Sequence, residues 1–243
     1  MKAMILAAGM GTRLKPWTLH HPKALVPVGG VSMLERVICS LQKQGFKKII
    51  INIHHFGDQI IDFLKQTDFG VEVYVSDERG ELLDTGGGIL HASEFLRVDN
   101  DPFLIHNVDI LSNADLAALM SWHKNKGNDA TLLVSRRDSS RKLIVSDDMK
   151  LKGWHNLKSD EYRPLGIVPE STDCEFAFSG IHVMSVDMLQ AMTDTGFKGA
   201  FPVMDFYLKN TNRYEFGCKL SENLDLIDIG KPETLERANE LFK

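Results

Sequence analysis

Two periods of apolar residues alternate along the first half of this chain, and each period predicts a different element. Short, nearly continuous apolar runs are typical of strands that a parallel sheet buries on both faces. Such runs lie at 2–6, 47–53, 71–75, 103–109 and 130–134. Apolar residues three or four positions apart predict amphipathic helices, and these lie at 32–44, 58–64, 89–96 and 113–126. The alternation predicts a three-layer α/β fold, a mostly parallel twisted sheet with helices on both faces.

The pattern changes near Ser135, where the apolar stretches become shorter. Alternating pieces at 142–145, 151–154 and 176–183 predict a small β-rich insertion or lid on the sheet, with 159–169 as its loosest part. Two short helices, two strands and a last helix complete the prediction, at 185–192, 201–208, 215–220, 224–229 and from Pro232 onward. Proline suits the first turn of a helix, and this helix is expected to turn inward Leu235, Ala238 and Leu241.

Composition limits the class of protein further. With 243 residues, of which 43% are apolar, the chain is expected to form a single domain over 1–243. A net charge of −5 excludes a general basic surface for nucleic acid, so an anionic ligand must meet a local cluster of cations. No apolar run approaches the roughly 20 residues of a membrane span, and three widely spaced cysteines form no disulfide framework or metal pairing. We therefore expect a cytoplasmic protein with no nucleic-acid or membrane partner.

The candidate chemistry begins in the stretch 6–16, directly after the first predicted strand. Gly9 and Gly11 lack a Cβ, so the backbone there can adopt positive φ and approach a ligand with its N–H groups pointing inward. Arg13 offers a permanently charged donor fork for phosphate oxygens, and Lys23 adds a compact ammonium for the same anion. The stretch predicts a loop that wraps a nucleoside triphosphate.

Two commoner phosphate-binding loops are excluded by the same residues. A dinucleotide fingerprint needs a third glycine where this chain has Leu14. A P-loop needs G-x-x-x-x-G-K-[ST], and no such run occurs in the chain. Neither nicotinamide chemistry nor Walker-type hydrolysis is therefore supported.

A carboxylate, Asp109, ends the predicted strand 103–109. In open α/β sheets the ligand crevice lies at the carboxyl ends of the strands, so Asp109 and the 6–16 loop are expected to face one cleft. An aspartate at the end of a strand also commonly caps the next helix. Position alone leaves both interpretations open.

Three separated motifs together resemble the sugar-1-phosphate nucleotidylyltransferase family: residues 6–16 followed by Pro22-Lys23, Asn107-x-Asp109, and Asp228-Ile229-Gly230. The similarity covers essentially the whole chain. It implies a Rossmann-like nucleotide-diphospho-sugar transferase fold, divided into a nucleotide-binding part at 1–134, a sugar-binding or lid part at 135–230 and a C-terminal helix at 231–243. It also implies transfer of a nucleotidyl group from a nucleoside triphosphate to a sugar-1-phosphate, with release of pyrophosphate.

The charged residues suit the chemistry that this resemblance implies. Both reactants are anions, so catalysis depends on neutralising charge and holding geometry. Arg13 and Lys23 are the candidate catalytic cations. Asp109 and Asp228 are the candidate ligands of Mg²⁺, the implied cofactor, because this hard cation prefers oxygen ligands. The assignment of Asp228 rests more on the resemblance than that of Asp109.

Nucleotide binding is expected from two stretches of the chain. The first loop contributes Leu6, Ala8, Gly9, Gly11 and Thr12. In the second stretch, 83–88, glycines that include Gly86 would let the base lie on the backbone while Asp84 or Thr85 reads its edge. Three glycines at a helix start lose local stability, which argues for a ligand. This Thr-Gly-Gly-Gly form resembles that of N-acetylmuramate-1-phosphate uridylyltransferases and mannose-1-phosphate guanylyltransferase-like proteins, and we favour UTP slightly over GTP.

The sugar side matches the family less closely. Many members carry a Glu-Lys-Pro whose lysine touches the sugar phosphate, whereas 153–158 contains no such triplet. Lys142 and Lys158 are possible substitutes, and spacing does not choose between them. The family's sugar-contacting positions correspond to Asn107, Glu175, Ser179 and Gly180. The expected product is UDP-N-acetylmuramate, for cell-wall recycling, with a GDP-mannose-type product from mannose- or heptose-1-phosphate as the alternative.

Two other classes of protein remain open at this point. A phosphocholine cytidylyltransferase or cofactor guanylyltransferase of similar fold would keep the first loop but need not keep 85–88. A non-catalytic nucleotide-sugar sensor would be expected to lose Arg13 or one carboxylate, and neither loss is seen. Nothing in the sequence sets an oligomeric state.

Overall fold

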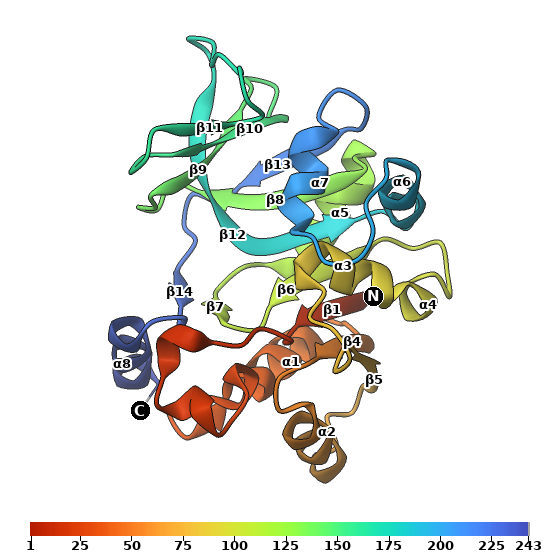
Figure 1. Ribbon diagram of the computed structural model, residues 1–243, viewed down its shortest axis with the longest axis vertical. Coiled ribbons are helices and arrows are strands. Elements are labelled where there is room, and N and C mark those ends of the chain that lie inside the picture. The colour runs from red at the N-terminus through yellow and green to blue at the C-terminus, as the bar shows by residue number, and fades with distance from the viewer. Residues whose placement is uncertain (243) are drawn as a thin grey trace.

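The computed structural model describes residues 1–242, which form a mixed α/β structure around a ten-stranded sheet (Figure 1). Four neighbouring strands at one end of this sheet, in the order β6, β1, β4 and β5, are all parallel, with β5 at the edge. Their bounds are Phe103–Asn107, Lys2–Leu6, Lys48–Ile53 and Glu72–Asp77, respectively. The residues of β1, β4 and β6 are almost all buried, because layers of helices cover both faces of the sheet, whereas β5 is partly exposed.

Beyond β6 the pairing becomes antiparallel through the long strand β12 (Cys174–Met184). The amino-terminal part of β12 pairs with β9 (Arg141–Val145), which is followed by β10 (Leu151–Asn156) and β11 (Glu161–Arg163). This antiparallel extension projects from the rest of the sheet in Figure 1. It corresponds to the predicted β-rich insertion, and β11 forms a short strand inside the segment expected to be loosest.

The remaining strands complete the sheet and form two small ribbons. On the main sheet β8 (Ala130–Ser135) pairs with β12, and β13 (Phe216–Leu220) lies parallel to β8. One ribbon joins β7 (Ile110–Ser112) to β14 (Leu226–Asp228), and the other joins β2 (Pro27–Val28) to β3 (Val31–Ser32). The predicted strand 103–109 therefore ends at Asn107, and Asp109 lies in the turn that precedes β7.

Helices cover both faces of the sheet, which confirms the predicted layers. One face packs against α1 (Met33–Lys43), α2 (Gly57–Gln66) and α5 (Leu116–Lys126). The other packs against α3 (Asp84–His91), α4 (Ser93–Leu96), α6 (Met188–Asp194) and α7 (Val203–Lys209). Ser32 caps α1, because its side chain accepts a hydrogen bond from Glu35 N at 3.2 Å.

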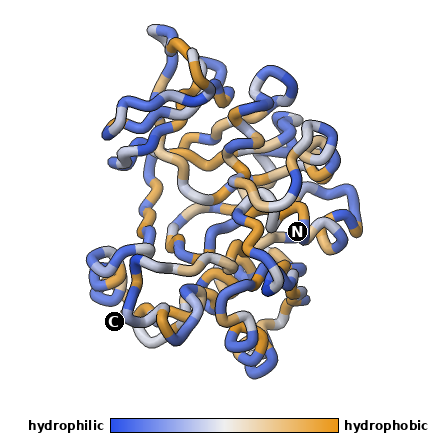
Figure 2. The backbone as a smooth tube through the Cα atoms, in the orientation of Figure 1, coloured by the Kyte–Doolittle hydropathy of each residue, from blue (hydrophilic) through white to orange (hydrophobic). Residues whose placement is uncertain are grey.

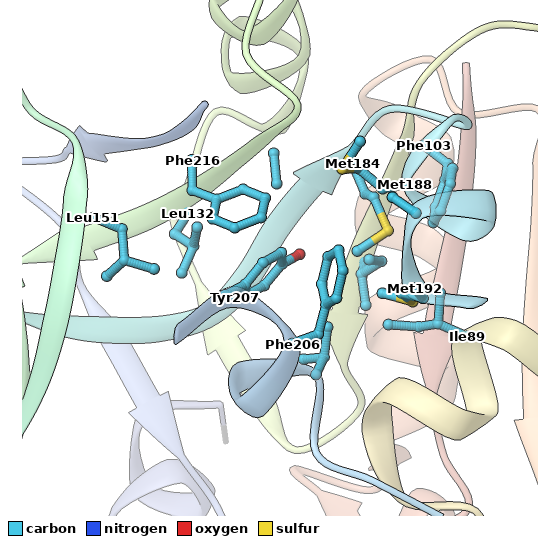
Figure 3. Packing of buried hydrophobic residues seen from close by; sticks show 14 of the residues in the cluster. Ile89, Phe103, Leu132, Leu151, Met184, Met188, Met192, Phe206, Tyr207 and Phe216 are labelled. Carbon is cyan, nitrogen blue, oxygen red and sulfur yellow. The ribbon is translucent and has the colours of Figure 1, made fainter. Parts of the chain in front are cut away.

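The strand period of two sends neighbouring residues into separate apolar cores. Ala3 and Ile5 of β1 join the core under α1, whereas Met4 between them joins the core under α7. Figure 2 shows the apolar residues concentrated along the central strands and the hydrophilic ones on the outer helices and loops. Figure 3 shows Phe206 and Tyr207 of α7 directed toward Phe216, and the Tyr207 and Phe216 ring centroids lie 4.9 Å apart.

A third, smaller core joins the two ends of the chain. The last helix, α8 (Pro232–Leu241), lies beside the N-terminal loop in Figure 1. Buried Leu14 from that loop packs in one cluster with Ile229 and Ala238. Leu241 is 64% exposed, so the prediction that it faces inward is wrong. This core fixes the 6–16 loop against the segment that carries Asp228.

Candidate active site

The 6–16 loop is held against Lys23 by close backbone packing. Gly11 has φ +61°, and a Cβ there would lie only 2.8 Å from Lys23 Cβ. Thr18 donates a hydrogen bond to Gly11 O at 2.9 Å and ties the two ends of the turn together. At Gly9 a Cβ would meet no atom within 4 Å, so this side of the loop faces open space. Gly11 therefore serves the fold of the loop, and Gly9 leaves its surface accessible.

Lys23 and Asp109 form an ion pair in the cleft. The Lys23 ammonium donates to Asp109 Oδ2, and the two side chains are only 12% and 15% exposed. The Asp109 carbonyl accepts a hydrogen bond from Ile229 N at 3.0 Å. Asp228 is the register partner of Ile110 in the β7–β14 ribbon, so it lies next to Asp109. Two aspartates far apart in the sequence thus become neighbours along the backbone of the ribbon.

Arg13 reaches the same place from the N-terminal loop. A Cβ built on Gly230 would lie 2.6 Å from Arg13 Nη2 and 2.8 Å from Asp228 Oδ1. The guanidinium and the carboxylate therefore both lie against Gly230. The four charged residues that the sequence singled out therefore form two pairs, Lys23 with Asp109 and Arg13 with Asp228, which the β7–β14 ribbon joins.

The carboxylate pair suits a hard cation better than a transition metal. Within residues 1–242, no group of three or more His, Cys, Asp and Glu side chains is arranged to hold a metal ion. Magnesium in phosphate-binding sites is commonly held by only one or two carboxylates, with substrate oxygens and water completing its shell. Asp109 and Asp228 match this number of carboxylates, and their binding of Mg²⁺ stays a prediction.

A cavity of about 450 Å³ opens at the carboxyl ends of β1, β4 and β6. The predicted site residues among those that line it are Leu6, Ala8, Gly9, Lys23, Asp84, Thr85, Asn107 and Asp109. Asn52, Leu82, Val108 and Ala200 also line it and were not predicted. The other predicted site residues do not line it, and these are Gly11, Thr12, Arg13, Gly86, Glu175, Ser179, Gly180 and Asp228. A larger groove of about 850 Å³ lies between α1, β14 and α8, and contains none of the predicted site residues.

The glycines at the start of α3 serve close packing against the segment 199–201. Gly86 N donates to Phe201 O at 2.8 Å, and a Cβ on Gly86 would lie 2.2 Å from the Phe201 ring. A Cβ on Gly87 would lie 2.2 Å from Gly199 O. The contribution of Gly86 to base binding stays a prediction, because its N–H already has a protein partner. The neighbouring Asp84 has φ +57° and accepts from Thr85 N at 2.6 Å.

Gly87→Ala is expected to lower the free energy of unfolding by about 2 kcal/mol, because the new methyl group meets rigid backbone. Chemical denaturation measures this difference. Gly80→Ala is the matched control, since a Cβ there meets nothing within 4 Å, and we expect a change within about 0.5 kcal/mol. Equal stability of the two variants would contradict the packing account.

Behind the cavity lies a buried series of hydrogen bonds that the sequence does not predict. Ala7 N donates to Asn52 Oδ1 at 2.7 Å, and Asn52 Nδ2 donates to Glu78 Oε1 at 2.8 Å. Glu78 is 3% exposed, and its Oε2 has no partner among the described residues. Burial raises the pKa of the Glu78 carboxyl above its ordinary value. This series of hydrogen bonds fixes the backbone at the start of the 6–16 loop.

Glu78→Gln is expected to raise the melting temperature at pH 7.5. Because folding raises the pKa of Glu78, ionisation costs stability once the pH exceeds the ordinary value of 4.5, and the full cost remains above the raised pKa. The gain should therefore shrink as the pH falls toward 4. Thermal unfolding at several pH values tests this, with exposed Glu81→Gln as control. A lower melting temperature of Glu78→Gln at pH 7.5 would mean that the ionised carboxylate stabilises the fold.

The predicted sugar-side residues fall into two groups. Gly180 lies beside the cavity wall, because a Cβ there would be 2.8 Å from Asn107 Nδ2. Ser179 is 1% exposed, and its hydroxyl is occupied by Ile181 N at 3.2 Å. Glu175 pairs with His155 Nδ1 at 2.6 Å in the antiparallel extension. The structure therefore places Asn107 and Gly180 together, and Glu175 among the residues of the extension.

The parallel sheet, with a glycine-containing cationic loop at its carboxyl edge, defines this chain as a Rossmann-like α/β protein. Residues 2–143 match the nucleotidyl transferase family, and the chain belongs to that family.

Two similar proteins are named for different nucleotidyl transfers. A probable mannose-1-phosphate guanylyltransferase of Oryza sativa is 33% identical over 152 residues, which cover 61% of this chain and 42% of the rice protein. This chain therefore spans less than half the length of that relative. The N-acetylmuramate alpha-1-phosphate uridylyltransferase of Caulobacter vibrioides is 27% identical over 214 residues, which cover 84% of this chain and 82% of that protein.

A solved structure shows the same fold. The structure of a putative glucose-1-phosphate thymidylyltransferase from Bacillus anthracis matches 100% of this chain and 95% of its own, with a TM-score of 0.80 at 21% identity. The comparison confirms the predicted fold class. Within residues 1–242 none of the helices has the length and apolar character that crossing a membrane requires.

Proposed function

We propose that this protein transfers a nucleotidyl group from a nucleoside triphosphate to a sugar-1-phosphate. The observation that carries the proposal is the meeting of Arg13, Lys23, Asp109 and Asp228 beside the cavity at the carboxyl ends of the parallel strands. Two cations and two carboxylates suit a reaction between polyphosphate anions, in which charge neutralisation dominates catalysis. Membership of the nucleotidyl transferase family supports the same chemistry.

The charged residues have separate roles in the reaction. A phosphate oxygen of the sugar-1-phosphate attacks the α-phosphorus and forms a new P–O bond. The bond from the α-phosphorus to the bridging oxygen breaks, and pyrophosphate leaves with the electron pair. Arg13 and Lys23 neutralise the triphosphate, and Asp109 holds Lys23 in position. No protein nucleophile is required.

The two carboxylates are the proposed ligands of Mg²⁺. Asp109 and Asp228 would hold the ion together with phosphate oxygens of the substrates. When bound, Mg²⁺ supplies positive charge and Lewis acidity to the reacting phosphates.

For the particular reaction we propose UTP as donor and N-acetylmuramate-1-phosphate as acceptor, giving UDP-N-acetylmuramate for the cell wall. The Caulobacter relative supports this choice, because the similarity spans more than four fifths of both chains. GTP is the second candidate, supported by the higher identity to the rice relative and by Asp84. A carboxylate only accepts hydrogen bonds. Guanine offers it two adjacent N–H donors, whereas uracil offers one N–H between two carbonyls, so a carboxylate at the edge of the base matches guanine better.

A substrate matrix tests the proposal. UTP, GTP, CTP and TTP are each combined with N-acetylmuramate-, mannose-, glucose- and heptose-1-phosphate in the presence of Mg²⁺, and pyrophosphate release is measured. We expect one pair to exceed the others, with UTP as the donor. A preference for GTP would make GTP the proposed donor and UTP the alternative. Absence of pyrophosphate with all pairs would contradict nucleotidyl transfer to these sugars.

A further inference from the structure

Arg137 is a half-buried cation beside the carboxylate pair that the reaction described above does not use. It follows β8, whose carboxyl end points toward the cleft, and it lies close to β12. Its Nη2 donates to Phe178 O at 2.8 Å, directly before Ser179 and Gly180. Burial lowers the pKa of Arg137, and attraction to Asp228 opposes that shift. Arginine stays protonated in proteins, so Arg137 is a permanent cation in this part of the site.

The hydrogen bonding of Arg137 is incomplete. Its Nε is buried and has no partner among residues 1–242. No carboxylate of the described chain lies within 4 Å of its guanidinium nitrogens, whereas the adjacent Arg136 pairs with Glu222 at 3.2 Å on the surface. Buried donors in folded proteins normally have partners. An arginine that is partly desolvated, charged and short of an acceptor is suited to an anionic ligand.

Arg137 and Lys23 lie at different parts of the site. Lys23 binds Asp109 beside the nucleotide loop, and Asp109 directly precedes the β7–β14 ribbon that carries Asp228. Arg137 donates to Phe178 O, directly before the Ser179–Gly180 turn. Gly180 contacts Asn107, which lines the cavity. A phosphate bound at Arg137 would therefore lie on the side of the Ser179–Gly180 turn, apart from the nucleotide loop.

We propose that Arg137 binds the phosphate of the acceptor and supplies the cation that the missing Glu-Lys-Pro lysine would provide. The Nη1 and Nη2 groups each carry two N–H donors, so the planar guanidinium can donate to two phosphate oxygens while Nη2 keeps its bond to Phe178 O. Lys142 and Lys158, the substitutes considered from the sequence, are less well placed. Lys142 donates to Arg137 O at 2.8 Å, and Lys158 is exposed in the extension. The inference rests on the proposed transfer to a sugar-1-phosphate.

Arg137→Gln tests the inference, because glutamine keeps a donor for Phe178 O but loses the charge. With UTP and N-acetylmuramate-1-phosphate, or the pair that the matrix identifies, we expect the KM for the acceptor to rise about 50-fold. The KM for the triphosphate should change less than about twofold, since its phosphates lie at the loop. Arg137→Lys keeps the charge without the fork and should show an intermediate KM. Arg136→Gln is the matched control, with both constants unchanged.

A structural role would give a different result. If Arg137 only holds β12, then Arg137→Gln and Arg137→Lys would change the two KM values equally or leave both unchanged, and either result overturns the inference. Should Arg137→Gln fail to fold, Arg137→Lys decides by the same comparison of the two KM values. If the wild-type protein forms no pyrophosphate with any pair, the proposed function fails. If it is active and the acceptor KM of the variants is unchanged, only the assignment of Arg137 fails.

Discussion

Asp109→Asn is expected to reduce pyrophosphate release about 1,000-fold at saturating Mg²⁺ and substrates. Asparagine preserves the shape of the side chain but removes the negative charge that both Lys23 and the metal need. Lys23 would then be left 12% exposed without its ionic partner. The measurement is kcat from a pyrophosphate assay, together with a melting curve that shows the variant to be folded.

The matched control for Asp109→Asn is Asp101→Asn, which breaks a surface ion pair. Asp101 binds Lys124 at 2.8 Å, and its side chain is 69% exposed. Exposed ion pairs contribute little to stability, so this variant should keep wild-type kcat and melting temperature. Wild-type turnover of Asp109→Asn would remove Asp109 from the metal-binding role.

Arg13→Ala is expected to lower kcat about 100-fold while changing the dissociation constant of the triphosphate less than about fivefold. The reason is that negative charge accumulates on the pyrophosphate as it leaves, so a fixed cation stabilises the transition state more than the bound substrate. Arg13 Nη2 lies against Gly230 beside Asp228, close to the proposed metal ligands. Pyrophosphate kinetics give kcat, and equilibrium titration of the nucleotide gives the dissociation constant.

The comparison for Arg13→Ala is Arg97→Ala, which removes an exposed arginine after α4. This control should leave both constants unchanged. An Arg13→Ala variant with wild-type kcat, or with kcat and affinity reduced to the same extent, would contradict a role for Arg13 in the departure of pyrophosphate.

The sequence predicts the central layers well because burial leaves a local pattern. The run 47–53 is apolar on both faces, and the structure has β4 at Lys48–Ile53. The β7–β14 ribbon is different: each strand has three residues, and its register joins Ile110 to Asp228. The periodicity of neighbouring residues cannot reveal that two strands so far apart in the sequence pair with each other. It is nevertheless the pairing that places Asp228 beside Asp109, so this part of the site depended on the family resemblance.

Residues whose role depends on burial were harder to predict. Glu78 and Arg137 look like ordinary surface charges in the sequence, and only tertiary packing encloses them. The glycines of 86–88 predict an approach for the base, and this stays a prediction, but the sequence does not show that Gly86 and Gly87 also make room for the segment 199–201. Leu241 fits the helical period but lies at the exposed end of α8. In each case the deciding neighbour is distant in the chain.

A crystal structure with a non-hydrolysable triphosphate and Mg²⁺ tests the central claim most directly. The account predicts the base and ribose in the cavity lined by Ala8, Gly9 and Thr85, with the phosphates within hydrogen-bond distance of Arg13 or Lys23. It also predicts the ion on Asp109 and Asp228. A nucleotide bound elsewhere, for example in the larger groove between α1, β14 and α8, would contradict the account.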